Sequence, residues 1–327
     1  PIKVTKTLGA DILRLWVAAT DYSGEMSISD EILKRTADSY RRIRNTLRFL
    51  LANTNGFDPA QHSAAAADLL ALDQWIVAQT LALQSELQGH YDDYHFHIAM
   101  QKIHNFCSET LGGFYLDVIK DRQYTTQADS LARRSCQTAM YHVTEAMTRW
   151  IAPILSFTAD EVWENMPGQR DDLGVFTAEW YDGLFAYSNT EIDASTWESV
   201  EQLRAEVMRN LEALRQDGKI GSSLDADVTI LADQVLIDQL QVLSDELRFV
   251  LITSAATLAP LNGVESDEII TLRNGSRILV QATPSEHQKC VRCWHHREDV
   301  GSHADHPDLC GRCVDNVAGG GETRRFA

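Results

Sequence analysis

The sequence predicts a mainly α-helical protein that continues into a small α+β unit and ends in a four-cysteine metal-binding module. Apolar residues recur at steps of three and four from about residue 9 to residue 163. Strand-like segments with a turn signal follow between residues 226 and 281, and two CxxC pairs lie near the end. At 327 residues the chain has the length of about two domains with substantial cores.

Residues 29–190 are predicted to form a helical bundle, preceded by a segment at residues 1–28. The clearest stripe of apolar side chains runs from Leu131 to Ile151. Ser29 is placed to cap the first long helix, because two acidic residues follow it at the positive end of the helix dipole. Several such stripes would each bury one face of a helix, and we therefore expect the helices to pack as a bundle.

A small α+β unit is predicted at residues 191–284. Ser195, with Glu198 three residues later, has the form of a capping box that opens a helix. Ala226–Leu231 and Leu247–Thr253 are strand candidates, although the second is equally compatible with the end of a helix. Two further short strands joined through Asn274-Gly275 are expected to form a hairpin: Ile269–Leu272 and Arg277–Gln281.

Residues 285–327 contain the most specific motif of the chain, two CxxC pairs separated by sixteen residues. Each pair can present two thiolates from one turn, and two pairs complete a tetrahedron around Zn²⁺. Four thiolates leave no coordination position for water or substrate, so one structural Zn²⁺ is predicted. Redox CxxC pairs and an iron centre are alternatives for the same residues. The predicted ligands are Cys290, Cys293, Cys310 and Cys313.

The four histidines that lie between the cysteine pairs are expected at the surface, because four thiolates already satisfy the ion: His295, His296, His303 and His306.

The net charge limits the ways in which this chain could bind nucleic acid. The formal charge of −18 argues against a protein that coats nucleic acid, so any RNA contact must be local. Each cluster of basic residues is more readily explained as a solvated helix face than as an RNA contact: Arg41, Arg42, Arg44 and Arg48, Lys120 and Arg122, Arg133 and Arg134, and Arg324 and Arg325.

No apolar run is long enough to cross a bilayer, so we expect no contact with a membrane. The cysteine usage favours the reducing cytoplasm. The chain begins at Pro1 without an initiator Met, which predicts that it is cut from a longer protein.

Several stretches resemble the bacterial isoleucyl-tRNA synthetases, and together they cover essentially the whole chain. The stretches are Leu8–Ala18 with Asp21-Tyr22, Tyr40–Leu50, Phe114–Arg122 and Ala152–Trp163. The tail, CxRCW followed by CxxC, is similar to the terminal zinc finger of that family and favours it over the valine and leucine enzymes. The family's HxGH and KMSKS motifs and its editing domain have no match. The resemblance is therefore to the carboxy-terminal part.

This resemblance implies an anticodon-binding bundle and a finger that lies against the anticodon loop. It implies that Arg292 and Trp294 contact RNA, and Arg41, Arg42 and Arg44 are candidates for phosphate contacts. The family joins isoleucine to tRNA(Ile) with ATP. Because ATP and isoleucine would bind in the missing catalytic domain, this chain should be inactive alone. The expected partners of this monomer are the tRNA(Ile) anticodon arm and its own catalytic domain.

Two other classes of function fit parts of the sequence. A stand-alone RNA-binding protein derived from a synthetase would share every feature above. Some DNA glycosylases combine a related four-cysteine finger with an N-terminal proline nucleophile, and Pro1 fits that pattern. However, Ile2 stands where those enzymes have Glu, and the helical bundle has no counterpart in them.

Overall fold

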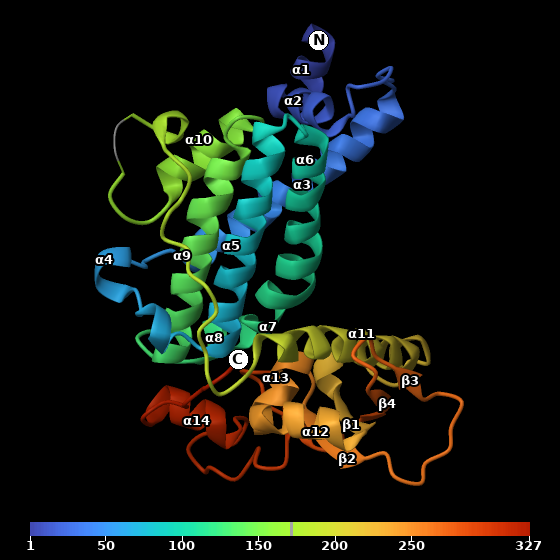
Figure 1. Ribbon diagram of the computed structural model, residues 1–327. Helices are drawn as coiled ribbons and strands as arrows, with labels where there is room; N and C mark the ends of the chain where they lie inside the picture. Colours follow the sequence, from blue (N-terminus) through green and yellow to red (C-terminus); the bar gives the residue numbers. More distant parts are fainter. Residues whose placement is uncertain (171–172) are drawn as a thin grey trace. The chain divides into compact units, whose positions relative to one another are not determined.

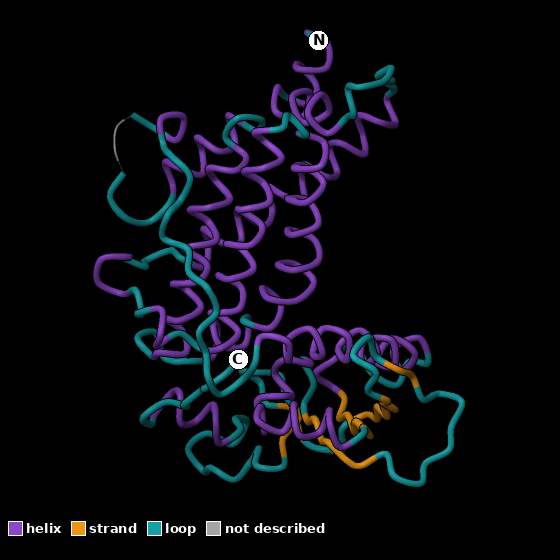
Figure 2. Tube along the Cα trace, in the orientation of Figure 1, coloured by secondary structure: helices purple, strands orange, loops and turns teal. Residues whose placement is uncertain are grey.

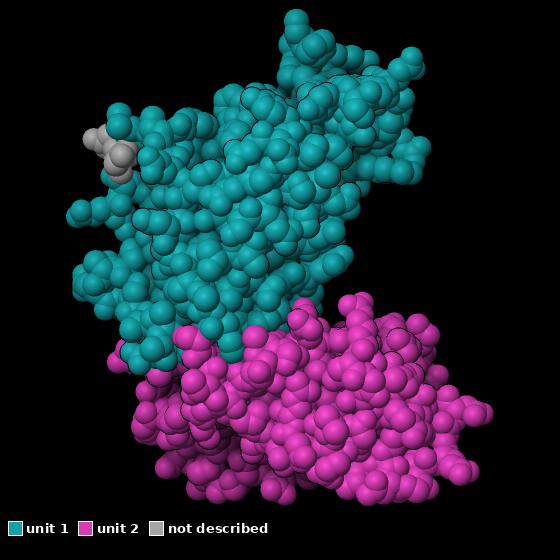
Figure 3. All heavy atoms as spheres, in the orientation of Figure 1, with its two compact units in different colours: residues 1–69, 73–117, 134–187 teal, residues 70–72, 118–133, 188–327 magenta. Residues whose placement is uncertain are grey.

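The computed structural model describes residues 1–170 and 173–327, which fall into two compact units (Figure 3). The first unit comprises residues 1–69, 73–117 and 134–187. The second comprises residues 70–72, 118–133 and 188–327. Within the described residues, the strands all belong to the second unit, and the first consists of helices and loops (Figure 2).

Long helices form the first unit (Figure 1). Its main elements are α1 (Ile2–Leu8), α2 (Ala10–Ala19), α3 (Asp30–Asn53), α5 (Ala71–Asp92), α6 (Phe96–Asn105), α9 (Leu131–Ile151) and α10 (Ser156–Asn165). Short turns connect them: α4 (Pro59–His62), η1 (Ala66–Asp68), α7 (Leu116–Val118) and η3 (Val175–Thr177). The N–H of Ile32 donates to the Ser29 hydroxyl at 3.2 Å, which confirms the predicted cap of α3.

The apolar stripes form the core of this unit, as the spacing predicted. Met140, Val143 and Trp150 on α9 are fully buried. The helix α6 continues directly into a π-helix, η2 (Phe106–Tyr115), whose turns are wider than those of an α-helix. A Cβ atom at Gly112 would lie 2.9 Å from the carbonyl oxygen of Cys107, so the π-helical turn favours glycine at that position.

The second unit contains a four-stranded sheet in the order β2-β1-β4-β3. Its strands are β1 (Ala226–Ala232), β2 (Ala255–Pro260), β3 (Ile270–Thr271) and β4 (Arg277–Pro284). The strands β1 and β2 are parallel, whereas β4 is antiparallel to both β1 and β3. The helix α11 (Ala194–Gln216) contacts β4, and its apolar residues Trp197 and Leu203 are fully buried.

The crossover from β1 to β2 is helical. It consists of α12 (Gln234–Leu240), η5 (Gln241–Glu246) and α13 (Leu247–Leu251), while η4 (Ser223–Asp225) precedes β1. The predicted hairpin is confirmed, because Ile270 pairs with Ile278 across β3 and β4. The remaining elements of this unit are α8 (Lys120–Thr125), β5 (Gln288–Lys289), β6 (His296–Arg297) and α14 (Gly311–Ala318).

One local expectation is wrong, and the structure resolves a second one that the sequence left open. Asp193, rather than Ser195, caps α11, and its carboxylate accepts a hydrogen bond from the N–H of Ser195 at 2.8 Å. Of the two alternatives for residues 247–253, the structure shows the helical one: Leu247–Leu251 form α13, after which Ile252 turns the chain in the left-handed conformation. Its run of buried apolar residues carries no periodicity that separates helix from strand.

Among the described residues, no helix combines the length and the apolar character needed to cross a membrane.

Candidate metal centre and nucleic-acid interface

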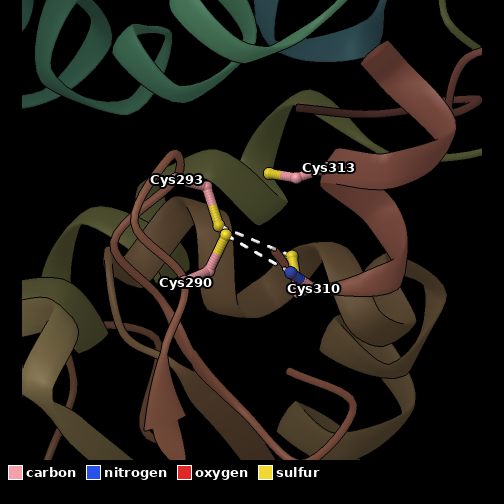
Figure 4. Close-up of side chains that lie close together, drawn as sticks. All are labelled: Cys290, Cys293, Cys310 and Cys313. Carbon is pink, nitrogen blue, oxygen red and sulfur yellow. Dashed lines mark hydrogen bonds between the residues drawn. The ribbon is translucent and has the colours of Figure 1, made fainter. Parts of the chain in front are cut away.

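The four predicted metal ligands meet in the second unit (Figure 4). Cys290 and Cys293 lie on the turn that joins β5 to β6, whereas Cys310 precedes α14 and Cys313 lies in its first turn. The four sulfur atoms lie within 4.8 Å of one another, and all four residues are buried. The sequence spacing therefore predicted the cluster correctly.

The cluster has the dimensions of a zinc tetrathiolate. With Zn–S bonds of about 2.3 Å, a tetrahedron separates its sulfur atoms by about 3.8 Å, and the sulfurs of Cys293 and Cys310 are 3.7 Å apart. The N–H of Cys310 lies 3.4 Å from the sulfur of Cys290 and can donate to a thiolate. Four buried sulfur ligands fit a closed, structural Zn²⁺ site with no position for a reacting molecule.

A buried network of ion pairs attaches this module to residues 118–133. Asp121 on α8 accepts two hydrogen bonds from Arg312, at 2.6 and 2.8 Å, and one from Arg324 at 2.6 Å. Burial alone would raise the pKa of Asp121, but the two guanidinium groups outweigh burial and hold it well below its ordinary value. Because Arg312 lies between two of the cysteines, Asp121 fixes α8 to the metal-binding segment.

Arg292 and Trp294 occupy different environments on the finger. Arg292 Nη1 donates to the carbonyl oxygen of Thr125 at 2.6 Å and lies 3.9 Å from the sulfur of Cys313. The guanidinium of Arg292 therefore contacts the protein. Trp294 is 61% exposed and has a φ of 68°. That left-handed conformation costs a non-glycine residue about 1–3 kcal/mol, and the turn is held by the hydrogen bond from the Trp294 N–H to Cys290.

The arginines of α3 belong to the first unit. Arg41 and Arg42 are exposed, and Arg41 pairs with Asp38 at 2.7 Å. Arg44 binds the carboxylate of Glu161 on α10 through two hydrogen bonds, at 2.6 and 2.8 Å, which raise the pKa of Arg44. Arg44 also lines a groove of about 1110 Å³ between α3, residues 54–60 and α10. The structure therefore leaves Arg41 and Arg42 more accessible than Arg44.

Three residues expected at the surface are buried instead. His295 is 2% exposed, and its ring contacts Phe249 edge-on with centroids 5.5 Å apart. Arg122 and Arg324 are also buried, and Arg122 donates to the carbonyl of Ala132 at 3.1 Å. Both arginines have protein partners, so an isolated basic pair in the sequence did not indicate a solvated helix face at these positions.

Two family models match the chain. The model described as the anticodon-binding domain of tRNA ligase matches residues 73–230. The model described as a zinc finger found in FPG and IleRS matches residues 288–316, which contain the four clustered cysteines. Residues 73–230 thus match the anticodon-binding domain of tRNA ligases, and a match to a zinc finger follows at the four clustered cysteines.

Curated relatives indicate which of the tRNA ligases this chain resembles. The isoleucine–tRNA ligase of Methylococcus capsulatus is 57% identical over 327 residues, which is 100% of this chain and 34% of that protein. The isoleucine–tRNA ligase of Pseudomonas putida is 56% identical over 328 residues, again 100% of this chain and 34% of the relative. Along its whole length, this chain is similar to isoleucine–tRNA ligases. It spans about a third of the length of the curated relatives it matches.

Among solved structures, a ternary complex of LeuRS with tRNA and LeuAMS from Agrobacterium radiobacter K84 matches with a TM-score of 0.40 and 16% identity. The match covers 55% of this chain and 20% of that one.

Proposed function

We propose that this chain binds the anticodon arm of tRNA(Ile) as part of an isoleucine–tRNA ligase, which joins isoleucine to its tRNA with ATP. The observation that carries the proposal is similarity to isoleucine–tRNA ligases along the whole chain, including an anticodon-binding domain and a four-cysteine finger. ATP and isoleucine would bind in a catalytic domain outside this chain. The chain would then be a cytoplasmic, monomeric recognition part that is inactive alone.

In this proposal the chain has four functional segments. Residues 1–28 follow the catalytic domain, residues 29–190 form the anticodon-binding bundle, residues 191–284 form the α+β domain, and residues 285–327 form the finger. Anticodon binding far from the reacting atoms holds the acceptor end of the tRNA at the active site, so that remote binding energy supports the positioning of the reacting groups.

Zinc has a structural role in this proposal. Cys290, Cys293, Cys310 and Cys313 would hold the ion, which ties the β5–β6 turn to the start of α14. A segment of this length has few apolar side chains to bury, so metal binding supplies much of its folding free energy. The ion would thereby keep the strained turn at Trp294 in place and its indole exposed.

Trp294 is the finger residue best placed to contact RNA directly. Unpaired bases stack on exposed aromatic side chains, and one such stack contributes about 1–3 kcal/mol. Arg292 donates to Thr125 through Nη1, so its main effect would be to hold the finger in place, and any RNA contact would use its remaining N–H groups. Arg41 and Arg42 can reach phosphates without breaking a buried contact, whereas Arg44 is already held by two hydrogen bonds to Glu161.

The test is binding of the zinc-loaded chain to an RNA stem-loop with the tRNA(Ile) anticodon. Trp294→Ala should weaken binding about 5- to 150-fold, which corresponds to the loss of one base stack. Phe157→Ala, which removes another exposed aromatic side chain, is the matched control and should bind like the unmodified chain. Equal affinity of the Trp294→Ala chain would rule out stacking on this residue, and the absence of any RNA binding would contradict the proposed function.

A further inference from the structure

The second unit contains a cavity of about 440 Å³ that none of the functions above uses. It lies between the metal-binding segment and the η5–α13 region. Within the described residues, five arginines line it: Arg248, Arg297, Arg312, Arg324 and Arg325. We call this space the arginine cavity. Its volume lies within the usual range of small-ligand pockets.

Four of these arginines form ion pairs with carboxylates, and for three of them these pairs balance the charge. Arg312 and Arg324 both pair with Asp121 and with Glu322, at distances between 2.6 and 3.1 Å. Arg325 pairs with an exposed glutamate at the edge of the unit. Those charges are balanced within the protein. They explain how the tail of the chain is held, but they do not indicate a ligand.

Arg248 and Arg297 are balanced less completely. Arg248 is 4% exposed, and its Nε donates to Asp245 at 3.0 Å, but its buried Nη1 has no hydrogen-bond partner in the described structure. Arg297 donates to the carbonyl oxygen of Ser254 at 3.3 Å, and among the described residues its guanidinium has no ion pair with a carboxylate. Burial lowers the pKa of Arg248, and the nearby charges of Arg297 and Arg312 lower it further.

Two other buried groups on this cavity lack partners among the described residues. His295 also lines the cavity, and its Nε2 has no hydrogen-bond partner. Asp299 accepts from the N–H of Gly311 at 2.8 Å through one carboxylate oxygen, while its buried Oδ1 has no donor. Buried polar groups in folded proteins almost always have a partner, including water or a ligand. An anion that also carries a hydroxyl donor would satisfy these three groups together.

We propose that the arginine cavity binds a ribose phosphate, with the phosphate on Arg248, Arg297 and His295 and a ribose hydroxyl donating to Asp299. Guanidinium groups bind phosphate through charge-assisted hydrogen bonds. The 2′-hydroxyl is the group by which proteins distinguish RNA from DNA. A nucleotide of a bound RNA strand and a free nucleotide share this chemistry. If the bound ribose phosphate belongs to an RNA strand, the inference rests on the proposed function. If it belongs to a free nucleotide, the inference is independent of the proposed function.

The test is calorimetric titration of the zinc-loaded full chain with adenosine 3′-monophosphate, its 2′-deoxy analogue and inorganic phosphate. The ribonucleotide should bind several-fold more tightly than the deoxy analogue, and inorganic phosphate should compete with both. Arg248→Gln should weaken ribonucleotide binding about tenfold or more, because it removes a charge-assisted hydrogen bond. If the Arg248→Gln chain does not fold, Arg297→Gln provides the same test. Arg215→Gln, which changes an exposed arginine of α11, should have no effect.

Asp299→Asn should change the affinity for inorganic phosphate and the preference for ribose in opposite directions. Removing the negative charge should strengthen the binding of inorganic phosphate. It should also reduce the preference for ribose over deoxyribose, because a neutral amide oxygen accepts a weaker hydrogen bond from the hydroxyl than a carboxylate does. Displacement of the ribonucleotide by the tRNA(Ile) anticodon stem-loop would identify RNA as the source. Continued nucleotide binding in the presence of saturating stem-loop would identify a free nucleotide.

Three results would overturn the inference. The first is no binding of either nucleotide or phosphate at millimolar concentration. The second is unchanged binding in both arginine variants. The third is loss of zinc from these variants without a specific effect on nucleotide binding, which would show that the arginines only balance the charge of the thiolates. If the unmodified chain binds the stem-loop normally in any of these cases, the inference fails and the proposed function stands.

Discussion

Replacing Asp121 by Asn should destabilise the second unit by about 3–5 kcal/mol, the usual cost of removing one partner from a buried ion pair. The side chains of Asp121, Arg312 and Arg324 are only 14%, 13% and 2% exposed. Asn keeps the size of the side chain but not its charge. The two guanidinium groups would therefore remain buried opposite a neutral amide, with only Glu322 to balance them.

Urea unfolding measures the loss of stability, and hydrogen exchange of the amides in α8, α14 and the β5–β6 turn shows where it occurs. Zinc content is measured in the same samples. Asp38→Asn is the matched control, because it removes a salt bridge between side chains of Arg41 and Asp38 that are 65% and 53% exposed. Such exposed pairs contribute at most about 1 kcal/mol. If both variants lose the same small amount of stability, the network around Asp121 does not hold the finger to α8.

Other expectations concern the metal, protonation and the backbone. Chelating zinc should unfold residues 285–327 and leave the helical signal of the first unit, since its core contains no ligand of the site; a global loss of helicity would refute this separation. Burial lowers the pKa of His142 to about 4. The unfolded state therefore takes up the proton first, and the free energy of unfolding should fall by up to about 3 kcal/mol between pH 7 and pH 4. In a series of denaturation curves measured at different pH values, His142→Gln should reduce this fall in the free energy of unfolding. Gly112→Ala should destabilise the chain by about 1–3 kcal/mol through a clash with the Cys107 carbonyl. Gly89→Ala, where nothing lies within 4 Å, should stabilise α5 by about 1 kcal/mol, and thermal unfolding compares the two variants.

The features predictable from sequence are those that short stretches of chain determine. The apolar stripe of α9 repeats at helical spacing, Ser29 precedes two acidic residues, and the CxxC pairs hold their cysteines at fixed separations. Each of these signals lies within a few turns of the chain. The helices, the cap of α3 and the four-cysteine cluster could therefore be inferred without knowledge of the tertiary contacts.

The features that the sequence does not predict are of two kinds. Some depend on contacts between distant parts of the chain, and others depend on a choice between two neighbouring residues that fit equally well. Asp121 meets Arg312 and Arg324 across about two hundred residues, and no pattern near Asp121 indicates that pairing. His295 is buried because Phe249, from another part of the chain, covers its ring. Asp193 and Ser195 are both good caps, so the local sequence alone does not determine where α11 begins.

The measurement that tests the proposed function most directly compares binding of the zinc-loaded chain to tRNA(Ile) and to the same tRNA with an altered anticodon. Zinc is quantified in the same samples. Anticodon recognition predicts one zinc per chain and markedly weaker binding to the altered tRNA. Equal binding to both tRNAs with the zinc present would contradict anticodon recognition by this chain.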